Sequence, residues 1–398
     1  MGKPKIRFKG YVEDWEQRKF ADMAIRESAV QTASQEIPSV EYDDVVVEEG
    51  CLNKDISSKE MKKSGILFDG SQVLYGKLRP YLHNWLNPDF KGVAVGDWWV
   101  LKPIDLNKNF LYRLIQTQQF DNIANQSAGS KMPRADWNLI SNSAFMVPFS
   151  NEEQRKIGDY FLSLDHLITL HQRKCEETKI LKKYMLQKMF PQNGKKVPEI
   201  RFSGYTEDWE QRKLGEIYGS IGNAFVGTAT PYYVEQGHFY LESNNVKDGQ
   251  INHNSEIFIN DEFYEKQKDK WLHTGDVVMV QSGHVGHAAV IPKELNNTAA
   301  HALIMFRNPK EEIEPYFLNY EYQTDKVKKK IENITTGNTI KHILASDMQE
   351  FVVDVPKYEE QKVIASYFSH LDHLITLHQH KCEELRKIKK YMLQNMFV

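Results

Sequence analysis

The stretch EEQRKIGDYFLSLDHLITLHQRKCEETKILKKYMLQKMF, from Glu152 to Phe190, decides the architecture of this chain because it occurs twice. The second copy, EEQKVIASYFSHLDHLITLHQHKCEELRKIKKYMLQNMF, runs from Glu359 to Phe397. In both copies apolar residues recur in steps of three and four, which is the spacing of a stripe on an α-helix. Acidic residues begin each copy and lysines gather near its end, as the helix dipole favours. Each copy therefore predicts one long helix.

A narrow apolar stripe on so long a helix needs a partner helix, and the natural partner of each copy is the other copy. In each copy a His and a Cys lie four residues apart on the stripe. A zinc site shared by the two helices is one interpretation of this spacing, and a polar layer that fixes the register of the pair is the simpler one. We predict no metal site. The predicted helix-pair interface consists of Phe161, Leu164, Ile168, His171 and Cys175 with Phe368, Leu371, Ile375, His378 and Cys382.

A shorter repeat precedes each variable stretch of the chain. GYVEDWEQRKF at residues 10–20 returns as GYTEDWEQRKL at residues 204–214, whereas the segments that follow these two phrases share almost no identity. Near-identical frames therefore enclose two divergent inserts, as expected of an internal repeat with two specialised modules. The predicted divisions are a first variable domain with its connector at 1–151, a first helix at 152–190, a turn and second connector at 191–214, a second variable domain at 215–358, and a second helix at 359–398.

Composition narrows the classes of protein. The 398 residues are 41% hydrophobic and 26% charged, as in ordinary globular proteins. The polar start predicts no signal peptide, and no apolar run reaches the roughly 18 residues that cross a bilayer. Three cysteines without a disulfide framework suit a reducing cytoplasm, where we expect the protein to lie. Because the formal net charge is −3, any contact with nucleic acid must come from local patches.

The order of variable insert, EEQRKIGDYF helix, connector PEIRFSGYTEDWEQRKLGEI, second insert and repeated helix resembles the specificity subunit of a Type I restriction-modification enzyme, a bacterial defence system. The likeness covers essentially the whole chain. It implies an α+β fold with two mixed α/β target recognition domains, separated by two long antiparallel helices and related by a pseudo-twofold repeat.

The same resemblance implies a function. Each recognition domain would read one half of a split site in double-stranded DNA, and the helices would set the spacer between the halves. The repeated frames would bind two methyltransferase subunits, through which restriction subunits can join the complex. No membrane and no cofactor belong to this description.

Residues that suit DNA contact occur in two places in the first insert. In VLYGKLRPYLHNW, Tyr75, Lys77, Arg79 and Tyr81 stand at alternate positions, which predicts one face of a strand or extended loop. Arginine and lysine reach guanine acceptors or phosphates. A solvated edge with scattered charge is the plainer interpretation. The later loop SAGSKMPRADWNLI adds three further candidates, namely Ser130, Lys131 and Arg134.

The second insert offers counterparts in the same order, with different chemistry. Asparagine and glutamine pair naturally with adenine, and serine and threonine with bases or phosphate. Different side chains in equivalent places predict an asymmetric target. The candidates are Asn245 and Lys247 in YLESNNVKDGQI; Gln281, Ser282, His284 and His287 in VQSGHVGHAAVI; and Thr336, Asn338, Thr339, Lys341 and His342 in ITTGNTIKHIL.

Catalytic motifs are weak. GSQVLYGKL resembles a phosphate-binding loop, but Leu78 replaces the serine or threonine that would hold Mg²⁺. NPDF resembles the loop of amino-methyltransferases, but Asp89 replaces a proline, and no glycine-rich cofactor loop accompanies it. The sequence therefore predicts a non-catalytic subunit without a cofactor. Two alternatives stay open: a self-contained DNA methyltransferase or nuclease with two DNA-binding arms, and a helical scaffold that binds only protein.

Overall fold

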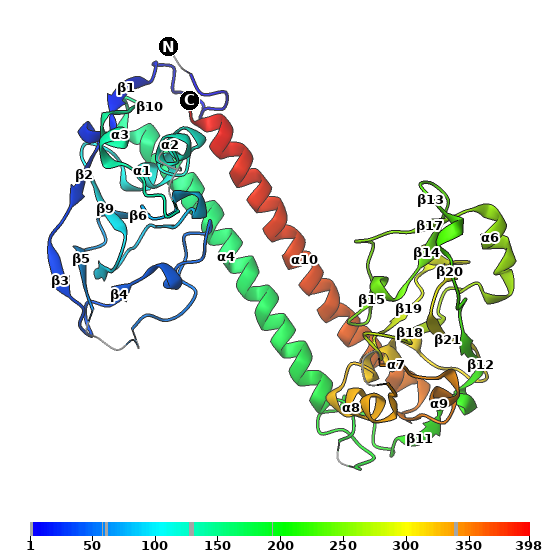
Figure 1. Ribbon diagram of the computed structural model, residues 1–398. Helices are drawn as coiled ribbons and strands as arrows, with labels where there is room; N and C mark the ends of the chain where they lie inside the picture. The colour runs from blue at the N-terminus through cyan, green and yellow to red at the C-terminus, as the bar shows by residue number, and fades with distance from the viewer. Residues whose placement is uncertain (1–2, 58, 60–62, 127–130, 193, 338–340) are drawn as a thin grey trace. The chain divides into compact units, whose positions relative to one another are not determined.

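The computed structural model describes residues 3–57, 59, 63–126, 131–192, 194–337 and 341–398. The chain forms two compact units: unit 1 contains residues 1–173 and 379–398, and unit 2 contains residues 174–378. Two long helices, α4 (Asn151–Lys188) and α10 (Tyr358–Met396), each contribute one part to either unit (Figure 1). Among the described residues no helix has the length and apolar character needed to cross a bilayer.

Within its described residues, unit 1 holds two four-stranded sheets and a two-stranded ribbon. Helix α1 contacts the first sheet at β6 and β9, and α2 packs beside α3. The first sheet has the order β2 (Ala24–Glu27), β9 (Trp98–Pro103), β6 (Val73–Gly76), β7 (Trp85–Leu86); the second has the order β3 (Val30–Thr32), β5 (Ser64–Phe68), β8 (Gly92–Ala94), β4 (Ser39–Val40); the ribbon joins β1 (Glu16–Lys19) to β10 (Ala144–Val147); and the helices are α1 (Lys108–Leu114), α2 (Gln118–Ala124) and α3 (Trp137–Asn142).

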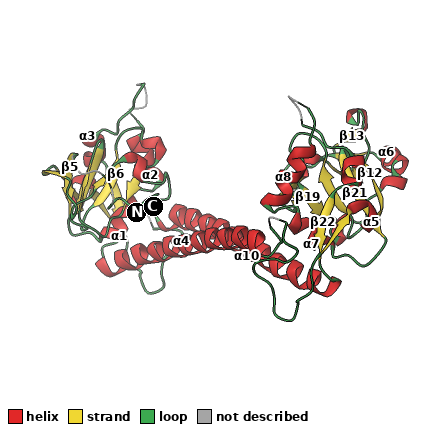
Figure 2. Ribbon diagram, turned by 90° about the horizontal axis from the view of Figure 1, so that it is seen from below, coloured by secondary structure: helices red, strands yellow, loops and turns green. Residues whose placement is uncertain are grey.

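Unit 2 also holds two four-stranded sheets and a two-stranded ribbon, and it adds one short two-stranded hairpin. Figure 2 shows its strands lying among short helices, as in unit 1. In the described residues the sheets are β12 (Tyr218–Asn223), β21 (Leu303–Pro309), β18 (Val277–Val280), β19 (Ala288–Val290), then β13 (Tyr233–Val234), β17 (Phe258–Ile259), β14 (His238–Leu241), β20 (Ala299–Ala300); the pairs are β15 (Val246–Lys247) with β16 (Gln250–Ile251) and β11 (Glu210–Lys213) with β22 (Val352–Val355); and the helices are α5 (Leu214–Ile217), α6 (Asp261–Lys266), α7 (Pro315–Glu321), α8 (Asp325–Ile334) and α9 (Ala345–Gln349).

The sheet β2-β9-β6-β7 of unit 1 corresponds to β12-β21-β18-β19 of unit 2, and both are antiparallel throughout. The central strands β6 and β18 are buried along their whole length because their apolar residues face cores on both sides of the sheet. The remaining four-stranded sheets differ in order, although each ends in one parallel pair. The units therefore share the first of these sheets and differ in the second, whose strands lie between β2 and β9 along unit 1 and between β12 and β21 along unit 2.

The repeated connectors dock in the same way in both units. In unit 1 the Ile6 N–H donates to the Asn395 carbonyl at 2.9 Å, and the Ile200 N–H of unit 2 donates to the Lys188 carbonyl at 2.9 Å. Each connector thus binds the end of one long helix. In unit 1 this contact places the N-terminal connector beside the C-terminal end of α10 (Figure 1).

Each connector also binds the start of the other long helix. The Arg7 guanidinium makes two hydrogen bonds to Glu153, at 2.6 and 2.9 Å. The Arg201 guanidinium repeats them with Glu360, both at 2.7 Å. Because both carboxylates are buried, these bidentate pairs hold the connector in one orientation. The stretch IRF at residues 6–8 and again at residues 200–202, just before each repeated phrase, therefore builds the same joint twice.

The long helices run antiparallel inside each unit. In unit 1 the Cys382 thiol donates to the Ile168 carbonyl at 3.7 Å, and in unit 2 the Cys175 thiol donates to the Ile375 carbonyl at 3.9 Å. Of the ten predicted interface residues, Ile375 and the two histidines are half-buried and the rest are buried. The buried residues are Phe161, Leu164, Ile168, Cys175, Phe368, Leu371 and Cys382.

Candidate nucleic-acid interface

A turn after β6 carries the first group of candidate residues. The Lys77 N–H donates to the Asp97 carbonyl at 2.9 Å, and the Lys77 carbonyl accepts from the Ala135 N–H at 2.8 Å. The Arg79 N–H donates to the Pro133 carbonyl at 2.7 Å. These bonds join residues 77–79, 97 and 133–135, which we call the first junction. The fold thereby brings together three segments that lie apart in the sequence.

Two cations meet one carboxylate at the first junction, which also carries Arg79. The Arg134 guanidinium makes two hydrogen bonds to the Asp97 carboxylate, at 3.2 and 3.0 Å, and the Lys77 ammonium lies 3.5 Å from the same carboxylate. The hydrogen bond from Arg134 lowers the pKa of Asp97, against the opposing effect of burial. Within the described residues the exposed Arg79 side chain makes no hydrogen bond or ion pair. The junction therefore presents one unpaired guanidinium beside two cations held by Asp97.

The predicted contact between Tyr75 and DNA is wrong. Tyr75 lies on β6, is 2% exposed and stacks on Trp99 with ring centres 5.5 Å apart. Both faces of this strand are buried, so the alternation that suggested an exposed face is absent. Tyr75 belongs to the core that supports the first junction.

The predicted extended face also ends earlier than expected. Arg79 adopts a left-handed backbone conformation, with φ 50° and ψ 63°, and a 3₁₀ turn follows over Pro80–Leu82. The left-handed backbone of Arg79 and the missing N–H of Pro80 explain why the extended backbone does not continue beyond Leu78. Tyr81 is exposed, but its side chain projects from a helical turn and not from the same strand face as Lys77.

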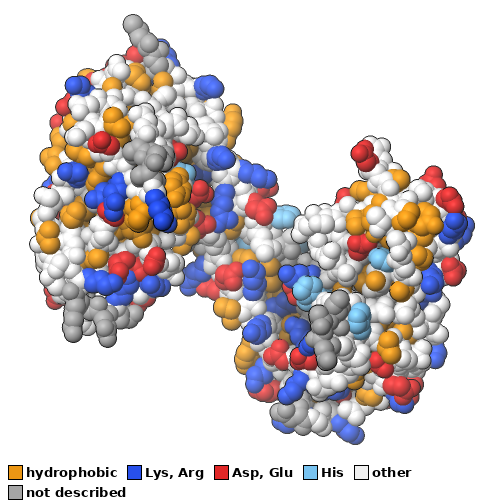
Figure 3. All heavy atoms as spheres, in the orientation of Figure 1, with side chains coloured by type: hydrophobic (Ala, Val, Ile, Leu, Met, Phe, Trp, Pro, Cys, Tyr) orange, Lys and Arg blue, Asp and Glu red, His pale blue; other side chains and the backbone are white. Residues whose placement is uncertain are grey.

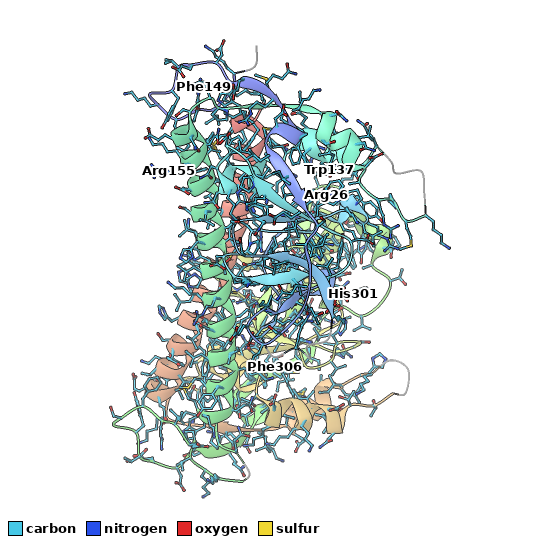
Figure 4. The ribbon with its side chains drawn as sticks, turned by 90° about the vertical axis from the view of Figure 1, so that its left-hand side faces the viewer. Arg26, Trp137, Phe149, Arg155, His301 and Phe306 are labelled. Carbon is cyan, nitrogen blue, oxygen red and sulfur yellow. The ribbon has the colours of Figure 1, made fainter. Side chains whose placement is uncertain are left out.

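The second predicted loop of unit 1 is partly described. Lys131 is exposed, Arg134 belongs to the first junction, and Ser130 lies outside the described residues. Arg26 on β2 has its guanidinium 5.1 Å from the centre of the Trp137 ring at the start of α3, and Figure 4 shows the two side chains beside each other. The sequence did not single out Arg26, because its proximity to this loop depends on the sheet.

Unit 2 contains a corresponding set of backbone contacts between residues 281–283 and 341–343, which we call the second junction. The Gln281 carbonyl accepts from the Ile343 N–H at 3.1 Å, and the Gly283 N–H donates to the Lys341 carbonyl at 3.1 Å. Ser282 forms an isolated antiparallel bridge with His342, as Leu78 does with Arg134 in unit 1. The two inserts therefore place these segments in the same order and with the same backbone bonds. The correspondence pairs Lys77 with Gln281, Arg79 with Gly283, and Arg134 with His342.

The second junction carries less positive charge than the first. His342 and Lys341 are exposed, and Lys341 forms an ion pair with Glu332 at 3.1 Å. Thr336 is also exposed and exchanges two backbone hydrogen bonds with His342, at 2.9 and 2.8 Å. The predicted candidates Asn338 and Thr339 lie outside the described residues. The donors and acceptors that face solvent here are mostly neutral.

Two histidines follow the second junction. The His284 ring is exposed and lies 6.3 Å from the half-buried His287 ring. Burial lowers the pKa of His287, whose Nδ1 accepts a hydrogen bond from the Asp248 N–H at 3.2 Å. His287 is therefore neutral at physiological pH and fixed in one tautomer, whereas His284 points to solvent.

The predicted role of Asn245 in DNA contact is wrong. The side chain is 1% exposed, its Oδ1 accepts from the Glu242 N–H at 3.0 Å, and its Nδ2 donates to the Asn252 carbonyl at 3.1 Å. An asparagine whose hydrogen bonds all stabilise a local turn is structural. Lys247, two residues later, is exposed on the β15–β16 hairpin.

Charge at the surface is mixed rather than uniform. On the face drawn in Figure 3, Lys and Arg side chains lie interspersed with Asp and Glu side chains in each unit. A nucleic acid would therefore be held by local clusters such as the junctions and not by one continuous basic region.

Two units with one matching antiparallel sheet, one way of docking the connector and one backbone junction, but different exposed side chains, define a duplicated recognition protein. The sequence matches the model of the Type I restriction modification DNA specificity domain twice, over residues 12–179 and 206–387. The chain belongs to this family, and its function is DNA specificity in a Type I restriction-modification system.

Individual relatives agree with this assignment. The Type I restriction enzyme MjaVIII specificity subunit of Methanocaldococcus jannaschii is 23% identical over 339 residues, which cover 82% of this chain and 76% of the relative. The putative MjaX specificity subunit of the same organism is 26% identical over 248 residues, which cover 61% of this chain and 56% of the relative.

Solved structures show the same fold. The Type I S subunit from M. genitalium aligns with a TM-score of 0.66 at 12% identity, covering 100% of this chain and 99% of that chain. A chain from a structure described as concerning complex assembly and conformational transition of the Type I R-M system aligns with a TM-score of 0.54 at 18% identity, covering 96% and 97%. The predicted fold class, mixed helix and strand with two recognition regions and a long helix between them, is confirmed.

Proposed function

We propose that the chain reads a bipartite, asymmetric site in double-stranded DNA, with one half read by each unit. The observation that carries this proposal is the pair of junctions, which share their backbone hydrogen bonds and differ in side chains. A shared backbone gives both units the same approach to the duplex, and different side chains select different bases. The two half-sites therefore differ in sequence.

The side chains suggest how each half-site is read. The unpaired Arg79 guanidinium suits the O6 and N7 acceptors of guanine, and Lys77 suits a phosphate. At the equivalent places of unit 2, the Gln281 amide suits adenine, and Gly283 lets the backbone approach closely. We infer that α4 and α10 set the number of unread base pairs between the two half-sites, because both helices are continuous.

We also propose that the frame binds two methyltransferase subunits, with restriction subunits joining through them. Both connectors dock identically, so each can offer a partner the same surface. Near the ends of the long helices, apolar side chains remain exposed at corresponding positions in both copies. These are Leu181 and Tyr184 in unit 2 and Ile388 and Tyr391 in unit 1. Duplicated exposed apolar residues are typical of a surface that a partner covers twice.

The alternative of a self-contained methyltransferase or nuclease makes a different prediction, so one assay separates the two. The purified chain, its methyltransferase partner and their complex are each incubated with host DNA and a labelled methyl donor. We expect site-specific methylation from the complex and none from the chain alone. Methyl transfer or cleavage by the chain alone would contradict a non-catalytic role. Mapping the methylated adenines then tests whether the site has two different halves with a fixed spacer.

A further inference from the structure

Asp97 lies on the surface where the first half-site would be read, between β8 and β9 of unit 1. A carboxylate that must approach DNA phosphates weakens binding, because like charges repel. The Asp97 side chain is 26% exposed and remains charged, since its hydrogen bond with Arg134 lowers its pKa. Its presence among three cations therefore calls for a role in recognition.

The position of Asp97 is fixed by its backbone. The Tyr42 hydroxyl donates to the Asp97 carbonyl at 2.7 Å and accepts from the Leu78 N–H at 3.0 Å. The Lys77 N–H donates to the same carbonyl at 2.9 Å. Because two elements hold this carbonyl, the carboxylate projects from a rigid point of the first junction.

The carboxylate in turn fixes the cations above it. Arg134 is 52% exposed, yet its Nε and Nη2 both donate to Asp97, at 3.2 and 3.0 Å. A bidentate pair of this kind sets the plane and the orientation of the guanidinium. The Lys77 ammonium, 3.5 Å from Asp97, is held less tightly.

We propose that Asp97 is a specificity-determining residue of the first half-site: it positions Arg134 for base contact and makes binding to unrelated DNA weaker. This inference rests on the proposed function of unit 1. With Asp97 in place, Arg134 and Lys77 cannot both turn freely to the nearest phosphates. A DNA sequence that presents an acceptor to the fixed Arg134 guanidinium gains a contact. Any other sequence gains no such contact, and Asp97 reduces the positive charge that its phosphates meet.

Unit 2 has no carboxylate at the place that corresponds to Asp97. Strand β21 begins at Leu303 opposite Val280, as β9 begins at Trp98 opposite Gly76. The residue before Leu303 is Ala302, which has no carboxylate to hold His342. Asp97 therefore acts on the first half-site alone, and the second half-site is an internal control.

The test compares complexes of the full chain with its methyltransferase partner that carry Asp97→Asn, Asp97→Glu or Glu152→Gln. Glu152 is an exposed residue in the first turn of α4, so its substitution makes the same change of charge outside the junction. The probes are a duplex enriched from a random pool by the wild-type complex, its single-base variants and a scrambled duplex of equal length, each at two salt concentrations.

We expect Asp97→Asn to bind the scrambled duplex about three- to tenfold more tightly at low salt, because two cations are released towards phosphates. The salt slope should steepen by about 0.9 for each released cation. Discrimination at the first half-site should fall by about fivefold or more, and discrimination at the second should not change. Asp97→Glu should retain part of the discrimination, and Glu152→Gln should leave both half-sites as in the wild type.

The other outcomes are equally informative. If Asp97→Asn leaves first half-site discrimination intact, or weakens binding to all duplexes alike, the proposal is overturned. Thermal unfolding of each variant shows whether a loss of binding reflects misfolding, and in that case the retained discrimination of Asp97→Glu decides. A wild-type complex that cannot distinguish the enriched duplex from the scrambled one would instead overturn the proposed function itself.

Discussion

The Lys182 ammonium lies 2.6 Å from the Asp372 carboxylate in unit 2, and the corresponding Lys389 lies 2.7 Å from Asp165 in unit 1. Each pair joins α4 to α10. In unit 2 the lysine lies on α4 and the aspartate on α10, whereas in unit 1 the lysine lies on α10 and the aspartate on α4. The ion pairs are therefore related by the internal repeat, and they fix the antiparallel register of the helices twice. A repeat that preserves partners as well as residue types preserves the geometry of the frame.

Breaking one of these pairs should destabilise the frame. Asp372 also accepts a hydrogen bond from the Tyr320 hydroxyl at 2.9 Å, so Asp372→Ala removes an acceptor from Tyr320 and leaves Lys182 with its hydrogen bond to Gln323, at 3.0 Å. Because both members of the Lys182 pair are largely buried, we expect a loss of about 2 kcal/mol in the free energy of unfolding. Glu384→Ala, which removes the exposed pair with Lys381, should cost much less, because solvent screens the pair. Urea unfolding measures both, and equal losses would contradict this ranking.

We expect Arg79 to lower the stability of unit 1 while it contributes to base recognition in the first half-site. Its left-handed backbone is unfavourable for a side chain with a Cβ, and unit 2 has Gly283 at the corresponding place, with φ 79°. Arg79→Gly should therefore stabilise unit 1 by about 0.5–1 kcal/mol and relax base choice at one position of the first half-site. Arg79→Ala is the matched control, since it should relax base choice without raising stability. A thermal shift that is the same for both variants would show that backbone strain is not the cause.

Arg79 and Gly283 occupy corresponding places in the two inserts, and the order of the segments that contain them could be predicted from the sequence. The repeated frames, the helix pair and the order of candidate segments follow from periodicity and self-similarity, because those signals are local or exactly duplicated. The burial of Tyr75 and Asn245 could not be read from alternation, since it depends on which faces of a strand or turn the rest of the insert covers. Asp97 could not be predicted as a site residue, because it lies far from Arg134 in the sequence and only the fold brings the two side chains together.

The stability of unit 2 should depend on pH through Glu321, the buried last residue of α7. Its Oε1 accepts from the Asp354 N–H at 2.9 Å, and burial raises its pKa to about 8. The folded pKa lies above the unfolded value of 4.5, so this contribution is complete below pH 4.5 and is lost as the pH rises to about 8. The difference of about 3.5 pKa units corresponds to a loss of about 5 kcal/mol. Glu321→Gln should flatten the profile in urea unfolding between these pH values, and an unchanged slope would refute the assignment.

The duplicated apolar residues should each bind one partner subunit. Replacing Leu181 and Tyr184 together by aspartate should lower the number of bound methyltransferase subunits from two to one, and the same change at Ile388 and Tyr391 should do so at the other site. Ile180 is the control: it is 67% exposed, but the second copy has a lysine there, so Ile180→Asp should leave two partners bound. Light scattering of the complexes gives the stoichiometry. Loss of both partners from either double variant would show that the two sites are not independent.

The length of the helix pair should set the spacer of the DNA site. Removing one heptad from α4 alone would separate Lys182 from Asp372, so the frame should lose stability rather than shorten cleanly. Removing Ile168–Lys174 from α4 together with Ile375–Lys381 from α10 keeps both Lys–Asp pairs in register, because each deletion lies between the two pairs along its helix. Each helix then shortens by about 10 Å and turns by only about 20° relative to its former face. Mapping the methylated sites of a host that carries this variant should show both half-sites unchanged and a spacer about three base pairs shorter, since base pairs rise about 3.4 Å along the duplex. Altered half-sites with the original spacer would mean that the helices do not determine the spacing.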